Sequence, residues 1–252
     1  MTRFSDKIVL ITGGRTGIGL ATALAFAREG ATSVIASRRA DEGEKIVALL
    51  QAQGAKASFL QTDVTVEAEV RRLFEQIMAR YGRLDIAFNN AGYEGTRSMV
   101  NELSETDWDA TINANLKGTW LSMKYEIQQM LVQGSGVIVN MAANLAYIGL
   151  PQMGAYSAAK AGILALTRVA TLETIRSGVR INAVSPGPVG TPMAERLFGS
   201  LENQQHMLGS LVPIGRAGTP EEVAAAVLWL SSPEASFVVG QDIVIDGGLL
   251  IQ

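Results

Sequence analysis

The chain alternates between short apolar runs and longer segments in which apolar positions recur at helical spacing. Most of the short runs are almost continuously apolar, which is typical of parallel strands buried on both faces. Strands that alternate with helices predict right-handed βαβ units, so we expect an α/β fold with one doubly wound parallel sheet of about seven strands flanked by helices. The expected strands are Ile8–Thr12, Ser33–Ser37, Ser58–Gln61, Leu84–Asn89, Gly136–Met141, Arg180–Val184 and Asp242–Ile245, and the expected helices are Ile18–Glu29, Asp41–Gln53, Val66–Tyr81, Asp107–Gln133, Ala155–Ser177 and Pro220–Leu230.

Composition removes several function classes. No linker or low-complexity tract interrupts the 252 residues, so we expect a single domain over residues 1–252. The formal net charge is −3, which argues against a nucleic-acid coat or a polybasic membrane surface. The chain has no cysteine, which excludes disulfides, thiolate metal sites and a cysteine nucleophile. Its one histidine, His206, argues against a zinc site or a Ser-His-Asp triad, so we expect no metal.

The longest charge-free stretch runs from Ile127 to Ala159, but amide side chains and a proline interrupt it, so it does not read as a membrane span. The N-terminus leads directly into a short apolar strand and lacks the long apolar region of a signal peptide. We therefore expect a cytoplasmic protein.

A glycine-rich segment follows the first expected strand and opens the first expected helix. Gly13, Gly17 and Gly19 have the spacing G-x3-G-x-G, with Arg15 and Ile18 between them. Glycines in this context let the backbone turn sharply and approach a pyrophosphate, which then sits at the helix N-terminus. The alternative is an ordinary tight turn between a strand and a helix, because a glycine triplet alone is a weak signal.

Six further motifs follow the glycine segment along the chain: Asp63-Val64, Asn89-Asn90-Ala91-Gly92, Asn115-Leu116-Lys117-Gly118, Tyr156-Ser157-Ala158-Ala159-Lys160, Pro186-Gly187 with Thr191, and Asp246-Gly247-Gly248. In kind and in order they resemble the motifs of the classical short-chain dehydrogenases/reductases, over nearly the whole chain. The resemblance implies a Rossmann-type sheet, a cofactor half at about residues 1–140, and a catalytic helix and substrate lid at about residues 141–252. It also implies a homotetramer, formed through the long central helices and the C-terminal strand.

The resemblance assigns cofactor contacts to particular positions of this chain. Asp63 and Val64 are expected to flank an adenine ring. The Asn90-Ala91-Gly92 turn and the loop after the sixth strand are expected to lie along the nicotinamide and its ribose. In that loop the resemblance assigns Pro186, Gly187, Val189 and Thr191, and it adds Tyr156 and Lys160 from the catalytic helix.

The end of the second expected strand bears on the choice between NADP(H) and NAD(H). NAD sites place a carboxylate there for the ribose 2′-hydroxyl, whereas NADP sites place an arginine for the 2′-phosphate. The sequence reads Ser37-Arg38-Arg39. Arg38 can pair with a phosphate through its planar fork, with Ser37 and Arg15 assisting. We expect NADP(H), with NAD(H) as the weaker option and two solvated surface arginines as the plain alternative.

Tyr156 and Lys160 are four residues apart on an expected helix and therefore share one face. Carbonyl reduction needs an acid at the oxygen, and alcohol oxidation needs the same group as a base. A nearby cation favours a phenolate, so we expect Lys160 to lower the pKa of Tyr156 from its usual value of about 10. The resemblance assigns Asn115 to a water-mediated proton relay with Lys160.

One position departs from the family pattern. The family carries a serine thirteen residues before the tyrosine, where it orients the substrate oxygen, and this chain has Ala143 there. Losing one such donor typically costs about 10²–10³-fold in turnover. Three interpretations stay open. Asn144, Tyr147 or Gln152 replaces the donor, or the protein is a slow enzyme, or it has lost catalysis and kept cofactor binding.

Candidate substrate contacts follow the nicotinamide-facing turns: Asn144, Tyr147 and Met153, with Glu94 expected to face solvent. This mixture suits a medium-sized ketone or secondary alcohol. The sequence thus predicts an NADP(H)-dependent oxidoreductase that acts on a small-molecule carbonyl/alcohol pair, with Tyr156 as the acid/base. The alternatives are a cofactor-binding sensor or scaffold with little turnover and, more remotely, an isomerase or dehydratase on the same scaffold.

Overall fold

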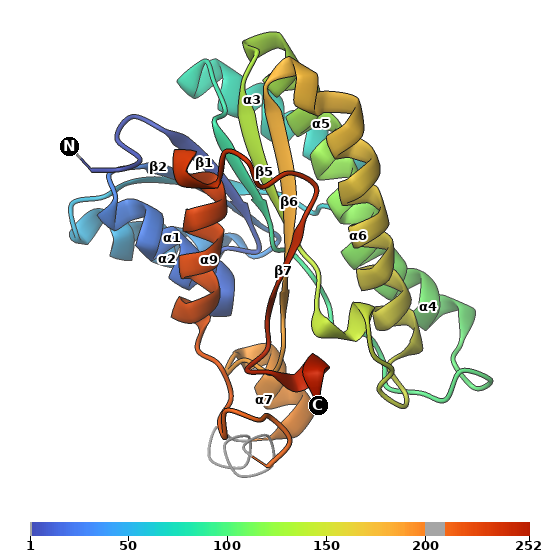
Figure 1. Cartoon of the computed structure of the whole chain (residues 1–252). Coiled ribbons are helices and arrows are strands. Elements are labelled where there is room, and N and C mark those ends of the chain that lie inside the picture. Colours follow the sequence, from blue (N-terminus) through green and yellow to red (C-terminus); the bar gives the residue numbers. More distant parts are fainter. Residues whose placement is uncertain (1, 200–209) are drawn as a thin grey trace.

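The computed structural model describes residues 2–199 and 210–252. One parallel sheet of seven strands runs through the centre in the order β3-β2-β1-β4-β5-β6-β7 (Figure 1). The strands are β1 (Ile8–Thr12), β2 (Thr32–Ser37), β3 (Lys56–Gln61), β4 (Ile86–Asn89), β5 (Gly136–Met141), β6 (Val179–Pro186) and β7 (Asp242–Ile245). The expected doubly wound α/β fold is therefore confirmed.

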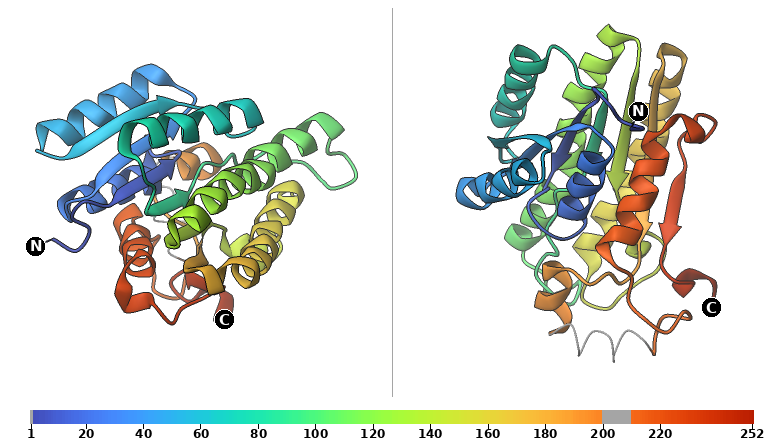
Figure 2. Two further views of the ribbon diagram at one scale, coloured as in Figure 1. Left: turned by 90° about the horizontal axis from the view of Figure 1, so that it is seen from above. Right: turned by 90° about the vertical axis from the view of Figure 1, so that its left-hand side faces the viewer.

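Helices cover both faces of the sheet (Figure 2). One face carries α1 (Gly17–Arg28), α2 (Ala40–Ala52) and α9 (Pro220–Ser231), and the other carries α3 (Glu67–Tyr81), α5 (Gly118–Gln133) and α6 (Gly154–Thr174). Short helices α4 (Glu105–Ile112) and α7 (Pro192–Phe198) lie near the carboxyl ends of the strands. Each face has its own apolar core, because strands buried on both sides contribute alternate side chains to the two layers.

The long helix expected at residues 107–133 is interrupted. A π-helical segment, η1 (Asn113–Lys117), lies between α4 and α5, and α4 begins earlier because the Ser104 side chain accepts a hydrogen bond from the Asp107 amide. A π segment widens the helix by one residue per turn, which apolar periodicity does not mark. Such segments are frequent at functional sites, and this one contains Asn115.

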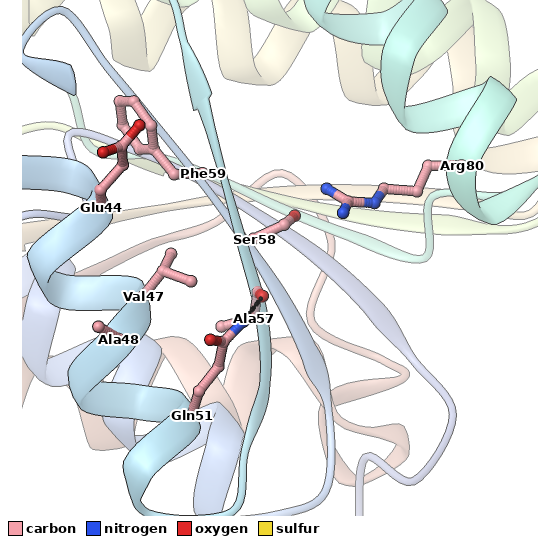
Figure 3. A pocket seen from close by; sticks show the side chains of 8 residues that line it. All are labelled: Glu44, Val47, Ala48, Gln51, Ala57, Ser58, Phe59 and Arg80. Carbon is pink, nitrogen blue, oxygen red and sulfur yellow. Dashed lines mark hydrogen bonds between the residues drawn. The ribbon is translucent and has the colours of Figure 1, made fainter.

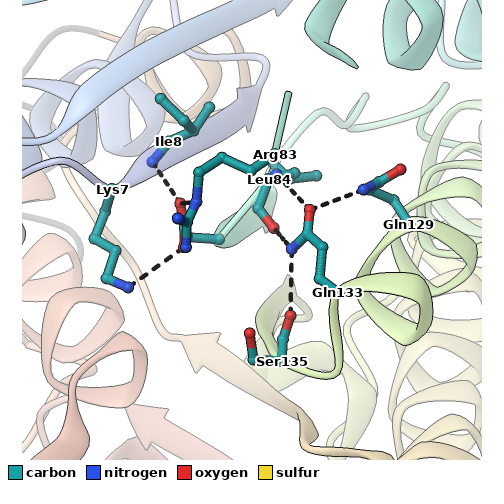
Figure 4. Close-up of polar contacts among 8 residues, drawn as sticks. Lys7, Ile8, Arg83, Leu84, Gln129, Gln133 and Ser135 are labelled. Carbon is teal, nitrogen blue, oxygen red and sulfur yellow. Dashed lines mark hydrogen bonds and ion pairs between the residues drawn. The ribbon is translucent and has the colours of Figure 1, made fainter. Parts of the chain in front are cut away.

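A network of polar contacts fixes the amino ends of β1 and β4, at the end of the sheet away from the glycine segment (Figure 4). The buried Asp85 carboxylate accepts hydrogen bonds from the Ile8 amide at 2.9 Å and from Arg83, and it pairs with Lys7 at 3.3 Å. Burial alone raises the pKa of Asp85, but these partners hold it below its ordinary value. The Gln133 side chain bonds both backbone groups of Leu84.

The β3 edge of the sheet carries a cavity of about 290 Å³ between α2 and α3 (Figure 3). The side chain of Gln51 reaches from α2 and donates to the Ala57 carbonyl at 3.0 Å, which occupies one of the free backbone groups of this edge strand. The cavity lies at the outer edge strand, whereas the sequence motifs gather at the carboxyl ends of the strands.

Candidate active site

The glycine segment and the Asn90-Ala91-Gly92 turn are joined by hydrogen bonds although about 75 residues separate them in the chain. The Thr12 hydroxyl accepts from the amides of Asn90 and Ala91, both at 3.1 Å. The Asn90 side chain in turn donates to the carbonyls of Thr12 at 3.0 Å and Gly13 at 3.1 Å. The carboxyl ends of the neighbouring strands β1 and β4 thus form one rigid edge.

The glycines of this segment are required by space and by backbone angle. A Cβ at Gly19 would lie 2.5 Å from the Gly13 carbonyl oxygen, and Gly13 (φ +67) and Gly17 (φ +54) adopt left-handed backbone angles. Helix α1 begins at Gly17 with no side-chain cap from Thr16, which leaves its first amides for a ligand. Backbone amides without a side-chain cap, glycines without a Cβ and the N-terminus of α1 together suit a pyrophosphate, so these residues fit a dinucleotide.

The expected 2′-phosphate contacts lie at the end of β2, but two of the three arginines are already paired. Glu42 of α2 bonds Arg39 at 2.7 Å and also pairs with Arg15 of the glycine segment. Arg38 is exposed and makes no ion pair within residues 2–199 and 210–252. The buried Ser37 hydroxyl has no hydrogen-bond partner among those residues. The sequence analysis did not predict a role for Glu42. Its spacing from Arg39 (i, i+3) could have indicated one ion pair, but its contact with Arg15 depends on the fold.

Asp63 and Val64 lie beyond the end of β3. Oδ1 of Asp63 accepts from both the amide and the hydroxyl of Thr65, at 2.9 and 2.8 Å, so the side chain stabilises its own turn. Val64 is buried against Gly118 at the start of α5, where an added Cβ would lie 2.8 Å from a Val64 methyl group. This turn has the fixed geometry that an adenine-contacting pair requires.

Asn115, Gly92 and Lys160 converge beside the turn after β4. The fully buried Asn115 amide donates to the carbonyls of Tyr93 at 2.7 Å and Thr111 at 2.8 Å, and its oxygen accepts from the Tyr93 amide. A Cβ at Gly92 would lie 2.8 Å from the Asn115 side-chain oxygen and 3.7 Å from Lys160 Nζ. Asn115 therefore holds the backbone after Gly92, and the turn brings it next to Lys160.

Tyr156 and Lys160 share one face of α6, as expected. The Lys160 ammonium nitrogen lies 5.4 Å from the centroid of the Tyr156 ring and donates to the Met141 carbonyl at 2.8 Å. Burial lowers the pKa of Lys160 to about 7. Burial also raises the pKa of Tyr156, and the Glu94 charge adds to that increase. The pKa of Tyr156 therefore lies above its usual value in this structure and not below it as expected, because burial dominates its shift.

Ala143 lies at the end of β5 and is buried, and it offers no hydrogen-bond donor to a ligand beyond its backbone. The next residue, Asn144, is also buried, and its side chain makes no hydrogen bond within the described part of the chain. Its amide is not among the fully buried polar atoms that lack a partner, so it stays accessible to a ligand, and Asn144 is the candidate to replace the missing hydroxyl. Gln152 is exposed at the start of α6.

The Tyr147 side chain, an expected substrate contact, is bonded to β7 in this structure. Its hydroxyl donates to Asp242 of β7 at 2.7 Å, and its ring lines a separate cavity of about 220 Å³ between α6 and β7. The partly buried Asp242 carboxylate needs a donor, and the loop after β5 supplies one. Met153 is buried directly before α6, where its backbone forms a bridge with Ser98.

Glu94 is buried, which corrects the expectation that it faces solvent. Arg196 of α7 donates to both carboxylate oxygens, from Nε at 2.5 Å and from Nη2 at 3.0 Å. Burial alone raises the pKa of Glu94, but these bonds and the guanidinium charge hold it below its ordinary value. The pair joins the turn after β4 to the helix after β6. The sequence analysis missed Arg196, because 102 residues separate it from its partner.

The loop after β6 reaches back to the glycine segment. A Cβ at Gly187 would lie 2.8 Å from the Asp246 Cα, so this close approach requires a glycine. Val189 is buried and pairs with Gly218, and Thr191 caps α7 by accepting from the Ala194 amide at 3.2 Å. An added Cβ at Gly17 would lie 3.2 Å from the Thr191 methyl group, so α7 begins directly beside the glycine segment.

Metal binding and membrane crossing can both be examined over the described residues. Within residues 2–199 and 210–252, no cluster of His, Asp or Glu has the geometry to hold a metal ion. The same residues include no helix that is long and apolar enough to cross a membrane. His206 lies outside the described residues.

Similarity to known proteins extends over the whole chain. Residues 13–250 match the family described as Enoyl-(Acyl carrier protein) reductase. The 3-oxoacyl-[acyl-carrier-protein] reductase FabG of Thermotoga maritima is 38% identical over 99% of this chain and 100% of its own length. Cyclohexanol dehydrogenase of Acinetobacter sp. is 38% identical over 97% of this chain and 95% of its own. The crystal structure of levodione reductase superimposes with a TM-score of 0.93 at 36% identity, covering 98% of each chain.

These relatives are named as reductases or a dehydrogenase, and each match covers at least 97% of this chain. The chain therefore belongs to the classical short-chain dehydrogenase/reductase family, whose members are oxidoreductases that use nicotinamide cofactors.

Proposed function

We propose that this protein is an NADP(H)-dependent oxidoreductase that transfers a hydride between the nicotinamide and a ketone or secondary alcohol. The observation that carries the proposal is the convergence of Gly92, Asn115, Lys160 and Tyr156 near a glycine segment in which Gly13 and Gly19 leave no space for a Cβ. Relatives named for cyclohexanol and levodione support a small neutral substrate.

The cofactor half, about residues 1–140, would hold the dinucleotide. Gly13, Gly17 and Gly19 lie against the pyrophosphate, whose charge the amides at the start of α1 stabilise. Arg38, which makes no ion pair among the described residues, would contact the 2′-phosphate, together with Ser37, whose hydroxyl has no partner among the same residues. Asn90 and Ala91 from the turn after β4, and Thr191 from the second half, would line the nicotinamide end.

When bound, the nicotinamide supplies or accepts the hydride. Tyr156 donates its hydroxyl proton to the substrate oxygen during reduction and accepts it back during oxidation. Because burial raises its pKa, Tyr156 is protonated at neutral pH, which is the form that reduction requires. Lys160, with a pKa of about 7, exchanges protons readily near neutral pH. Asn115 bonds the Tyr93 carbonyl and so fixes the backbone beside which a proton relay to Lys160 would run.

Asn144 would orient the substrate oxygen in place of the family serine. The position is buried and next to Ala143, and its amide has no other partner in the described structure. A donor at this place typically contributes about 10²–10³-fold to turnover. We therefore expect Asn144→Leu to lower turnover by about that factor, and Ala143→Ser to change it by less than about tenfold.

The test follows NADPH and NADH absorbance with cyclohexanone, levodione and a 3-oxoacyl thioester. The proposal expects turnover with NADPH that Tyr156→Phe abolishes although the variant still binds NADPH. A hundredfold gain on Ala143→Ser would instead identify Ala143 as a disabling residue and remove the role given to Asn144. Tight cofactor binding without turnover on any substrate, in the original and in Ala143→Ser, would replace the enzyme with a cofactor-binding sensor or scaffold.

We also propose that the chain assembles as a homotetramer. Large apolar side chains are exposed where long central helices and the C-terminal strand end, among them Val132, Leu172, Phe237 and Ile251. Such surface is usually covered in an assembly. Light scattering that gives the mass of one chain at micromolar concentration would refute this assembly.

A further inference from the structure

A line of hydrogen-bonded polar side chains crosses the core behind the catalytic helix. Asn89 of β4 donates from one amide nitrogen to Glu126 of α5 at 2.9 Å and to Asn140 of β5 at 3.0 Å. Asn140 donates to the Thr167 hydroxyl of α6 at 2.9 Å. Each of the four side chains is at most 2% exposed. The line therefore connects β4, α5, β5 and α6, that is, the strands that precede the Asn90 turn and Ala143, the helix that follows the η1 segment with Asn115, and the helix that carries Tyr156.

Two atoms of this line have no partner within the described residues: Oδ1 of Asn89 and Oε1 of Glu126. The two residues are already joined through their other polar atoms, and both unpartnered atoms are acceptors if Glu126 is ionised. One proton on Oε1 turns it into a donor and satisfies both atoms in a cyclic acid–amide pair. We propose that Glu126 carries this proton, donates it to Asn89, and is a positioning residue for the cofactor-facing turn that begins at Asn90.

The surroundings of Glu126 favour the neutral acid. Glu126 bonds the Asn89 amide of β4, and the hydrogen bonds continue from Asn89 to Asn140 of β5 and from there to Thr167 of α6, all of them uncharged. From its own helix, Lys124 and Tyr125 instead bond Glu67 of α3, at 2.6 and 3.2 Å. With no charged group facing it from these elements, burial raises the pKa of Glu126 to about 8, and the Asn89 bond opposes this only in part.

If Glu126 were ionised, its Oε1 and the Oδ1 of Asn89 would both be acceptors and would repel each other. This repulsion would act next to the candidate active site, because Asn89 on β4 and Asn140 on β5 each directly precede a residue of that site. Asn89 directly precedes Asn90, whose side chain fixes the glycine segment. Asn140 directly precedes Met141, whose carbonyl accepts from Lys160 at 2.8 Å. The proton on Glu126 thus bears on both the nicotinamide side and the lysine side of the site.

The first experiment compares the wild type with Glu126→Gln, because the glutamine amide reproduces the donor and the acceptor of the neutral acid. Urea unfolding is measured from pH 5 to pH 9.5 at one protein concentration. The unfolding constant of the wild type, divided by that of the variant, should rise about tenfold per pH unit up to pH 8 and then level off. The direction follows because the folded state binds the proton more tightly than the unfolded chain does. Parallel curves over the whole range would overturn the proposal.

Infrared absorption gives a direct readout. The wild type at pH 6.5 should show the carbonyl band of a buried carboxylic acid, and this band should be absent from Glu126→Gln. Its absence from the wild type would also overturn the proposal. Neither measurement needs cofactor or turnover, so they stand apart from the proposed oxidoreductase function.

The positioning role, which rests on the proposed function, is tested by NADPH fluorescence. Relative to Glu126→Gln, the affinity of the wild type should weaken above pH 8, and the comparison at each pH cancels the titration of Lys160. Glu126→Leu, which leaves both polar groups of Asn89 without this partner, should weaken NADPH binding about tenfold or more at every pH. Equal NADPH affinity and equal pH dependence for the wild type and the Gln variant would refute the role. If the Leu variant fails to fold, the Gln comparison still decides.

Discussion

Lys160 is a buried cation whose removal has a calculable effect on stability. Its side chain is 2% exposed, and burial lowers its pKa from 10.5 to about 7. Between these two pH values the unfolded chain binds a proton that the folded chain does not. The free energy of unfolding should therefore rise with pH from 7 to 10.5, and replacing Lys160 by methionine should remove this rise.

The size of the effect follows from the shift. One pKa unit corresponds to about 1.4 kcal/mol, so the drop from 10.5 to about 7 corresponds to about 5 kcal/mol between the two ends of the range. At pH 7 and below, the folded protein holds the charge in the core and this contribution is absent. The difference between wild type and Lys160→Met isolates it, because every other titrating group contributes to both proteins.

The assay is urea unfolding of both proteins at half-unit steps from pH 6.5 to pH 10.5. Lys45→Met is the matched control, because Lys45 is exposed on α2. The control should give a curve parallel to that of the wild type. The reasoning is refuted if the difference between wild type and Lys160→Met stays flat across this range, since the lysine would then titrate alike in both states.

Two further predictions concern the cofactor half. Glu42→Gln releases Arg15 and Arg39 from the carboxylate that both pair with. Because these ion pairs are partly exposed, we expect NADPH to bind only about fivefold more tightly, while the affinity for NADH stays unchanged. An equal gain in affinity for both cofactors in a fluorescence titration would contradict the assignment of these arginines to the 2′-phosphate. Gly19→Ala places a Cβ 2.5 Å from a backbone oxygen and should weaken both cofactors by about a hundredfold or more, whereas Gly149→Ala, which meets nothing within 4 Å, should bind like the wild type.

Much of the fold could be predicted from the sequence, because the patterns that specify strands and helix ends lie within a few neighbouring residues. The apolar runs predicted all seven strands, since a strand buried on both faces has no polar alternation. The expected helix at Pro220–Leu230 is α9, whose start is fixed locally by both bonds of a capping box between Thr219 and Glu222. The motif order predicted the family. A cytoplasmic location, the tetramer and the preference for NADP(H) stay predictions.

The sequence by itself determined the sheet, the glycine segment and the pairing of Tyr156 with Lys160 on one helix face, because each depends on neighbours within a few residues. Only the tertiary structure decided the electrostatics. Burial, which no local pattern reports, moved the pKa of Tyr156 upward and that of Lys160 downward. The partners of Glu94 and Glu126 come from elements far away in the chain, and a charge or a proton at such places depends on how those elements pack.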